Sequence, residues 1–104
     1  MTERRAMVMH LKPECVDAYV EYHRNVWPEL EDAYHRAGVK DITCYLHDTT
    51  LIVTMEVDPE VYRGTDIARG RHPVEQRWQA EMAKLRADDL TTVAFEEVYR
   101  LPPA

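Results

Sequence analysis

Two residues with polar tips, Tyr19 and His23, lie four positions apart in a stretch whose apolar residues recur every three or four positions. On a helix this spacing places both side chains on one face, one turn apart, and this face is the apolar one that turns inward. An imidazole donates and accepts protons near neutral pH, and a phenol beside it can hydrogen bond to a polar substrate. The pair therefore predicts either acid–base chemistry in a cavity or two core residues whose polar atoms bond to backbone groups.

The segment HRNVWPEL, residues 23–30, places a tryptophan and a proline in the same helical pattern. A proline inside a helix costs about 3 kcal/mol because it removes an amide hydrogen, so Pro28 predicts a kink or a junction between two helical pieces. Trp27 just before it is either a core residue or an apolar platform for a sugar ring. Trp78 allows the same two interpretations.

Composition indicates one globular domain over residues 1–104, since 45% of the residues are hydrophobic and the chain is too short for two cores. A formal net charge of −6 disfavours binding to nucleic acid or to an acidic membrane surface and is compatible with a small neutral or cationic ligand. Cys15 and Cys44 form no C-x-x-C pair and are expected to be buried thiols in a reducing compartment, the cytoplasm. No signal peptide or membrane span is expected.

The sequence offers little for a cofactor. It contains three glycines and none of the glycine-rich motifs that cradle phosphates, so no nucleotide cofactor is indicated. His72 and Glu75 are three apart, but no second histidine-containing pair lies near them, and the other histidines lack the spacing of metal ligands. We therefore expect neither a metal nor another cofactor.

The pattern of apolar residues predicts strands alternating with helices in the order βαββαβ. Period-two alternation favours strands, whereas three- and four-residue steps, proline starts and glycine stops favour helices. The expected strands are 6–11, 41–47, 51–57 and 91–101; the expected helices are a long one from residue 13 to 37, a short one within 60–71 and one from residue 73 to about 87.

This order is that of the ferredoxin-like α+β fold, an antiparallel sheet with helices on one face. The first strand, however, has apolar residues on both faces, so its second face needs a cover. A second copy packed sheet to sheet would supply that cover and enclose a cavity, and we therefore expect a homodimer.

Several segments together resemble the L-rhamnose mutarotases. These are the combination of Y-x-x-x-H with WPEL in residues 19–30, CYLHDTTLIVTMEV in residues 44–57, EQRW in residues 75–78 and EEVYRLP in residues 96–102. The resemblance covers nearly the whole chain. It implies a dimeric α+β barrel that interconverts the α and β anomers of a 6-deoxy sugar without a cofactor, with a monosaccharide as its partner.

The same resemblance implies roles for individual residues. Tyr19 would contact the sugar, His23 would be the proton donor, and Trp78 would be the first of the tryptophans that face the substrate. Two positions depart from the family pattern: Ile42 replaces a sugar-binding tyrosine, and Gln79 replaces the second tryptophan of a tandem pair. The segments VKDITCY and HPVEQRWQAEM are more similar to a branch associated with L-fucose, so the reaction is better indicated than the sugar.

Opening and closing a pyranose ring requires one acid, one base and room to rotate. We expect His23 to protonate the ring oxygen, with Trp27 and Trp78 shaping the apolar side of the pocket. The identity of the catalytic base is left open, and His10, His47 and a water molecule are candidates.

Two other functions fit the same fold. One is a cofactor-free monooxygenase on a dimeric α+β barrel, which is an analogy of fold alone. The other is a noncatalytic sugar-binding module in which the histidine is inert. Oxygen uptake would indicate the first, and saturable sugar binding without faster anomer exchange would indicate the second.

Overall fold

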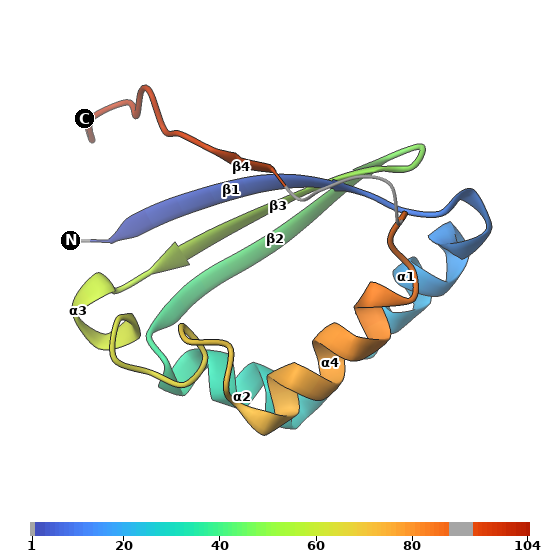
Figure 1. Ribbon diagram of the computed structural model, residues 1–104. Coiled ribbons are helices and arrows are strands. Elements are labelled where there is room, and N and C mark those ends of the chain that lie inside the picture. The colour runs from blue at the N-terminus through green and yellow to red at the C-terminus, as the bar shows by residue number, and fades with distance from the viewer. Residues whose placement is uncertain (1, 88–92) are drawn as a thin grey trace.

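The computed structural model describes residues 2–87 and 93–104. Four strands and the helices around them follow one another in the predicted βαββαβ order (Figure 1). In chain order the elements are β1 (Glu3–His10), the short 3₁₀ helix η1 (Pro13–Cys15), α1 (Val16–Arg24), α2 (Pro28–Arg36), β2 (Val39–His47), β3 (Thr50–Val57), α3 (Pro59–Tyr62), α4 (Pro73–Ala83) and β4 (Val93–Phe95).

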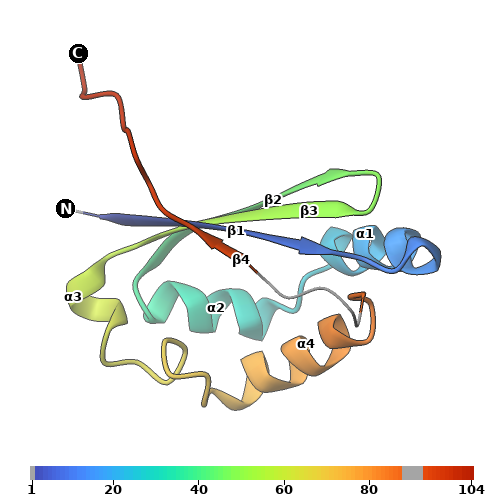
Figure 2. The ribbon, with the colours of Figure 1, turned by 45° about the horizontal axis from the view of Figure 1, so that its top comes forward.

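The four strands form one antiparallel sheet in the order β2-β3-β1-β4. Helices α1, α2 and α4 all lie on the same side of this sheet, as the two ribbon views agree (Figures 1 and 2). The predicted ferredoxin-like α+β fold is therefore confirmed. Within one chain the sheet does not close into a barrel, and no helix of the described residues covers its other face.

The predicted break at Pro28 is confirmed. Helix α1 ends at Arg24 and α2 begins at Pro28, which occupies the first helical position, where no amide hydrogen is needed. Trp27 caps α2 through its carbonyl, which accepts the amide of Leu30 at 3.0 Å. The long predicted helix is thus two helices at an angle, and His23 lies in the last turn of the first.

The core lies between the inner face of the sheet and the helices. Strand pairing sets Cys44, Val53, Met7 and Ala94 opposite one another, so this face presents a continuous row across all four strands. The buried apolar residues are Leu11, Tyr19, Leu30, Ala33, Ala37, Val39, Leu51, Val57, Tyr62, Ile67, Val74, Trp78, Met82 and Leu85.

The two cysteines are free thiols, but only Cys15 is half-buried. Cys44 is exposed because β2 is an edge strand, so the expectation of burial is wrong for Cys44.

Gly38 sets the turn from α2 into β2. Its φ of +84° lies in the left-handed region that disfavours other residues, and a Cβ at this position would approach the Cβ of Val61 to 2.8 Å. Both constraints require glycine here, which lets α3 pack against the start of the edge strand.

No helix in the described part of the chain is long and apolar enough to cross a membrane.

The last strand is shorter than expected. A strand over 91–101 was predicted, but β4 covers only Val93–Phe95, and residues 91 and 92 lie outside the described residues. After Phe95 the chain leaves the sheet on the side opposite the helices (Figure 2). Val98, Tyr99 and Leu101 are 72–88% exposed, and within residues 2–87 and 93–104 no strand pairs with this segment.

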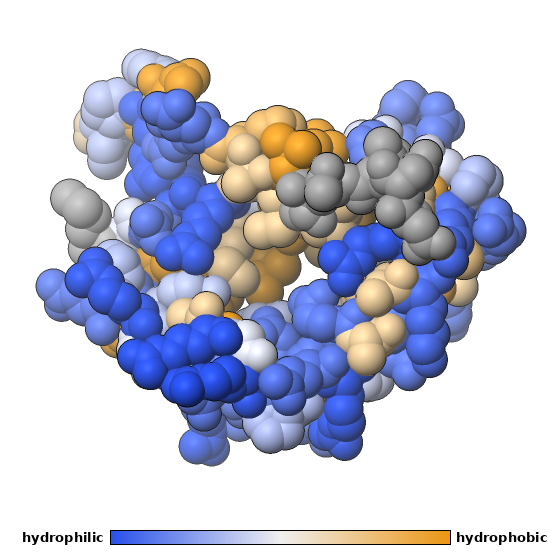
Figure 3. Space-filling view, in the orientation of Figure 1, coloured by the Kyte–Doolittle hydropathy of each residue, from blue (hydrophilic) through white to orange (hydrophobic). Residues whose placement is uncertain are grey.

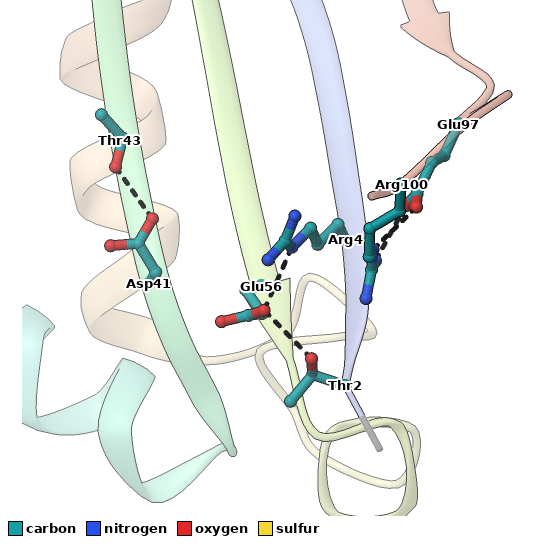
Figure 4. Close-up of polar contacts among 7 residues, drawn as sticks. All are labelled: Thr2, Arg4, Asp41, Thr43, Glu56, Glu97 and Arg100. Atoms are coloured by element: carbon teal, nitrogen blue, oxygen red, sulfur yellow. Dashed lines mark hydrogen bonds and ion pairs between the residues drawn. The ribbon is translucent and has the colours of Figure 1, made fainter. Parts of the chain in front are cut away.

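The outer face of the sheet carries a second row. Tyr45, Ile52, Val8 and Val93 lie opposite one another across the four strands, with Phe95 in the next row. One end of this face is polar: Glu56 accepts hydrogen bonds from Thr2 at 3.0 Å and Arg4 at 3.2 Å, and Arg100 forms two bonds of 2.8 Å with Glu97 (Figure 4). The outer face is therefore an apolar band with a charged border.

Candidate active site

A cavity of about 390 Å³ lies between the inner face of the sheet and helices α1, α2 and α4. The space-filling view shows the molecule hollowed here, with apolar residues deep in the hollow (Figure 3). The volume is within the range of about 300–1,000 Å³ typical of small-molecule sites. Its apolar lining consists of Met7, Met9, Val26, Leu30, Ile42, Val53, Met55, Trp78 and Met82, and its polar lining of Tyr19, His23, Glu31, Tyr34, Cys44, Glu75, Gln79 and Arg86.

Tyr19 and His23 face this cavity together, as their spacing predicted. Their rings stack with centroids 4.2 Å apart and planes 26° apart. Nδ1 of His23 lies 2.8 Å from the backbone carbonyl oxygen of Tyr19. Because a carbonyl only accepts, Nδ1 carries the hydrogen, and Nε2 is the ring nitrogen left for proton exchange with a ligand. The helix thus fixes both the orientation of the imidazole and its tautomer.

Trp78 holds the other side of the histidine. Its ring meets those of His23 and Trp27 edge to face, with centroids 5.3 and 5.1 Å apart. Trp78 is buried and lines the cavity. Trp27 is half-buried behind it, with the Arg77 guanidinium 5.9 Å from its ring centre, and is not among the lining residues. Trp27 therefore supports Trp78 in this structure, and Trp78 is the tryptophan that faces the cavity.

Tyr19 also contacts the edge strand. Burial raises the pKa of the Tyr19 phenol, and the nearby Cys44 thiol, which hydrogen bonds to it, raises it further. Burial likewise raises the pKa of Cys44, whose thiol faces the cavity although the residue is exposed on β2. Both groups are therefore neutral near pH 7, and Tyr19 serves as a hydrogen-bonding group with its proton in place.

A second polar group lies between α2 and α4. The Tyr34 hydroxyl donates to Oε2 of Glu75 at 2.7 Å, and Gln79 contacts the same phenol. Arg86, just after α4, lies 3.5 Å from Oε1 of Gln79. Glu75 and Gln79 both line the cavity. The sequence held a signal for Glu75, which lies three residues before the inward-facing Trp78 and therefore on a neighbouring face of the helix.

Ionisation of the two cavity phenols provides a test of their burial. Burial and then the Glu75 bond raise the pKa of Tyr34 above its ordinary value of 10.0, as burial does for Tyr19. The folded state therefore holds these protons more tightly than the unfolded state, so their contribution to stability is present below about pH 10 and is lost as pH rises above it. We expect the free energy of unfolding to fall above pH 10 and Tyr34→Phe to reduce that fall. Phenolate absorbance and urea unfolding across this range would check it, and an unchanged slope would contradict it.

The remaining histidines are elsewhere. His10 and His47 do not line the cavity; the side chain of His47 is 92% exposed beside Asp48, so neither candidate base lies at the site. Nδ1 of His72 accepts the amide of Val74 and caps α4. Within residues 2–87 and 93–104 no three histidine, cysteine or carboxylate side chains are grouped as a metal site would require.

Comparison with known proteins agrees with this geometry. Residues 4–101 match the family model of L-rhamnose mutarotase. The chain is 39% identical over 83 residues to an L-rhamnose mutarotase of Jannaschia sp., covering 80% of this chain and 79% of that one. It is 32% identical over 104 residues to an L-rhamnose mutarotase of Brucella anthropi, covering 96% and 97%.

A solved structure supports the same assignment. The crystal structure of an L-rhamnose mutarotase from Formosa agariphila superposes with a TM-score of 0.75 at 26% identity, covering 96% of this chain and 99% of that one. The fold of this chain is thus shared with a solved L-rhamnose mutarotase. The chain belongs to the L-rhamnose mutarotase family, a family of isomerases.

Proposed function

We propose that the protein interconverts the α and β anomers of L-rhamnose in the cavity between the sheet and the helices. The observation that carries this proposal is the stacked Tyr19–His23 pair, whose fixed tautomer leaves Nε2 of His23 for proton transfer in a cavity of suitable size. Membership of the L-rhamnose mutarotase family supports the choice of reaction. The experiment that tests the proposal is the rate of anomer exchange with and without the protein.

The reaction needs only proton transfers and a rotation. Because Nδ1 already carries the hydrogen that it donates to the Tyr19 carbonyl, Nε2 acts as the acid when the imidazole is protonated on both nitrogens. Nε2 then gives its proton to the ring oxygen while the anomeric hydroxyl gives its proton to water, so the bond between the anomeric carbon and the ring oxygen breaks and an aldehyde forms. Rotation about the adjacent carbon–carbon bond turns the other carbonyl face to the hydroxyl, and the reverse transfers close the ring as the other anomer. Solvent suffices as the second proton acceptor, since mutarotation also proceeds in water.

The surroundings of His23 serve this chemistry. Tyr19 keeps its phenol proton because burial raises its pKa, and it can donate a hydrogen bond to the sugar. Trp78 offers an indole face against which the apolar side of a pyranose packs. These positions hold the sugar near one nitrogen, and a positioned acid or base contributes typically about 10²–10⁴-fold to the rate.

L-Fucose is the second candidate substrate. Ile42 and Gln79, the two positions that depart from the family pattern, both line the cavity, so they act on substrate choice and leave His23 unaffected. We propose that exchange of L-rhamnose and of L-fucose be compared with the same protein. A kcat/KM higher for L-fucose than for L-rhamnose would assign L-fucose as the substrate and leave the reaction type unchanged.

We further propose that two copies pack through the outer faces of their sheets. Tyr45, Ile52 and Phe95 are large, apolar and 38–59% exposed there. A hollow of about 670 Å³ lies on the same face, next to the exposed Tyr99 of the C-terminal segment, and it contains no histidine. This larger hollow is better explained as surface that a second sheet covers than as a reaction site.

A negative charge introduced at the centre of the outer face tests the dimer. Wild type is expected to sediment at micromolar concentration with twice the chain mass of 12.2 kDa, and Ile52→Glu with a single chain mass, because the carboxylate would be buried in the interface. Val61→Glu is the matched control, since Val61 is 48% exposed on α3 and does not lie on the outer face of the sheet. A wild-type monomer, or an Ile52→Glu dimer, would contradict the proposal.

The state of the two cysteines bears on the cellular compartment. Both cysteines are free, which suits a reducing environment, and we propose the cytoplasm as the site of action.

A further inference from the structure

The cavity contains a carboxylate that the proton transfers above do not use. Glu75, at the start of α4, is half-buried and lines the cavity wall. Its Oε2 accepts the Tyr34 hydroxyl at 2.7 Å from the neighbouring α2 helix. A carboxylate bonded in this way is held in one orientation, and its other oxygen keeps its capacity to accept hydrogen bonds.

The surroundings of this carboxylate extend it into a polar row. Gln79 follows Glu75 by one helical turn and contacts the same phenol, and Arg86 bonds to the Gln79 amide oxygen at 3.5 Å. All four side chains line the cavity. The opposite wall is formed by apolar residues of the sheet such as Met7, so hydrogen bonds to a ligand on this side come from the α4 row.

We propose that Glu75, oriented by Tyr34, selects the sugar by accepting hydrogen bonds from its ring hydroxyls. This inference rests on the proposed function and adds the residue that discriminates among substrates. The ligand class is a neutral pyranose with adjacent hydroxyls, since a hydroxyl can donate to a carboxylate whereas a second anion would be repelled. Such charge-assisted bonds are shorter and stronger than neutral ones.

The bond between Tyr34 and Glu75 is what makes this selection sharp. A free surface glutamate adapts to many hydroxyl positions, but a carboxylate tied to α2 meets only those sugars whose hydroxyls reach it. A sugar lacking the right hydroxyl leaves the carboxylate partly unpaired, and sites built to hydrogen bond a hydroxyl reject analogues that lack it.

The chain supplies a matched control on the same helix. Tyr22 donates to Oε2 of Glu81 at 3.0 Å, so α4 carries a second tyrosine–glutamate bond of the same type. Neither Tyr22 nor Glu81 is among the residues that line the cavity. Any effect of removing such a bond on helix packing alone would therefore appear in Glu81→Gln as well as in Glu75→Gln.

The test measures kcat and KM for anomer exchange by NMR with wild type, Glu75→Gln, Tyr34→Phe and Glu81→Gln. The sugars are L-rhamnose, L-fucose and analogues of the preferred one that each lack one ring hydroxyl. We expect Glu75→Gln to raise KM for the preferred sugar about tenfold or more, with kcat changed by less than about threefold, since a charge-assisted bond is lost. Wild type should discriminate against one analogue, and Glu75→Gln should lose that discrimination, whereas Glu81→Gln should behave as wild type.

Two results would overturn the inference while leaving the proposed function intact. One is a KM and an analogue preference in Glu75→Gln equal to those in Glu81→Gln. The other is a fall in kcat at unchanged KM, which would make Glu75 a proton-transfer group and leave sugar selection to other residues. A wild-type protein that accelerates exchange of none of these sugars would instead overturn the proposed function, and this inference with it.

Discussion

Replacing His23 with alanine is expected to lower the catalysed rate of anomer exchange about 10²–10⁴-fold, because the proposed mechanism assigns to Nε2 the delivery of the proton to the ring oxygen. The loss should appear in kcat, since the sugar would still contact Tyr19 and Trp78. Saturation transfer between the α and β anomeric protons measures this rate at equilibrium. The fold should survive, because His23 is half-buried at the end of α1 and its stacking partners remain.

His35 provides the matched control for this variant. It also lies in the last turn of a helix, α2, but it is exposed and does not line the cavity. His35→Ala should keep the wild-type rate. If His23→Ala remained folded and kept that rate too, the assignment of His23 as the proton donor would be wrong.

Replacing Trp78 with alanine should have the largest effect on stability. The indole is 5% exposed and packs against the rings of Tyr22, His23 and Trp27, so the substitution leaves a cavity where three helical segments meet. Truncating a buried tryptophan costs about 3–5 kcal/mol, a large part of the roughly 5–15 kcal/mol that stabilises a domain. Urea unfolding monitored by circular dichroism would measure the change in the free energy of unfolding.

Trp78→Phe separates packing from mere size reduction. Phenylalanine keeps an aromatic ring against Trp27 and His23, so its loss of stability should be clearly smaller than that of Trp78→Ala. A loss of less than about 1 kcal/mol in Trp78→Ala would show that the aromatic cluster contributes little to the fold.

Local signals were sufficient for much of this molecule. Pro28 predicted the break between α1 and α2 because the reason is covalent: proline lacks an amide hydrogen wherever it occurs. The four-residue spacing of Tyr19 and His23 predicted their shared face, since the period of a helix does not depend on its surroundings. The alternating apolar residues predicted the strands that form β2 and β3, since the two-residue period of a strand does not depend on its surroundings either.

The C-terminal segment could not be predicted in the same way. Residues 96–101 have strand composition, but a strand needs a partner, and no strand in the described part of the chain pairs with this segment. The propensity of Val98 and Tyr99 describes what the segment can form, and pairing decides whether it does.

The pair of site residues that lies on one helix was predicted, whereas the pair that forms between two helices was missed. Tyr19 and His23 share α1, so their proximity follows from sequence spacing. Tyr34 and Glu75 are 41 positions apart, and only the packing of α2 against α4 brings them together. Trp27 packs edge to face against Trp78 and does not line the cavity, an arrangement that also depends on the packing of separate helices.

The most direct test is the rate of exchange between the anomers of L-rhamnose, measured by NMR saturation transfer at several concentrations of wild-type protein, with L-fucose in parallel. We predict that the rate above the aqueous background rises in proportion to protein concentration and saturates with sugar. A rate equal to the background for both sugars, with the protein folded, would contradict the assignment of anomer exchange to this cavity.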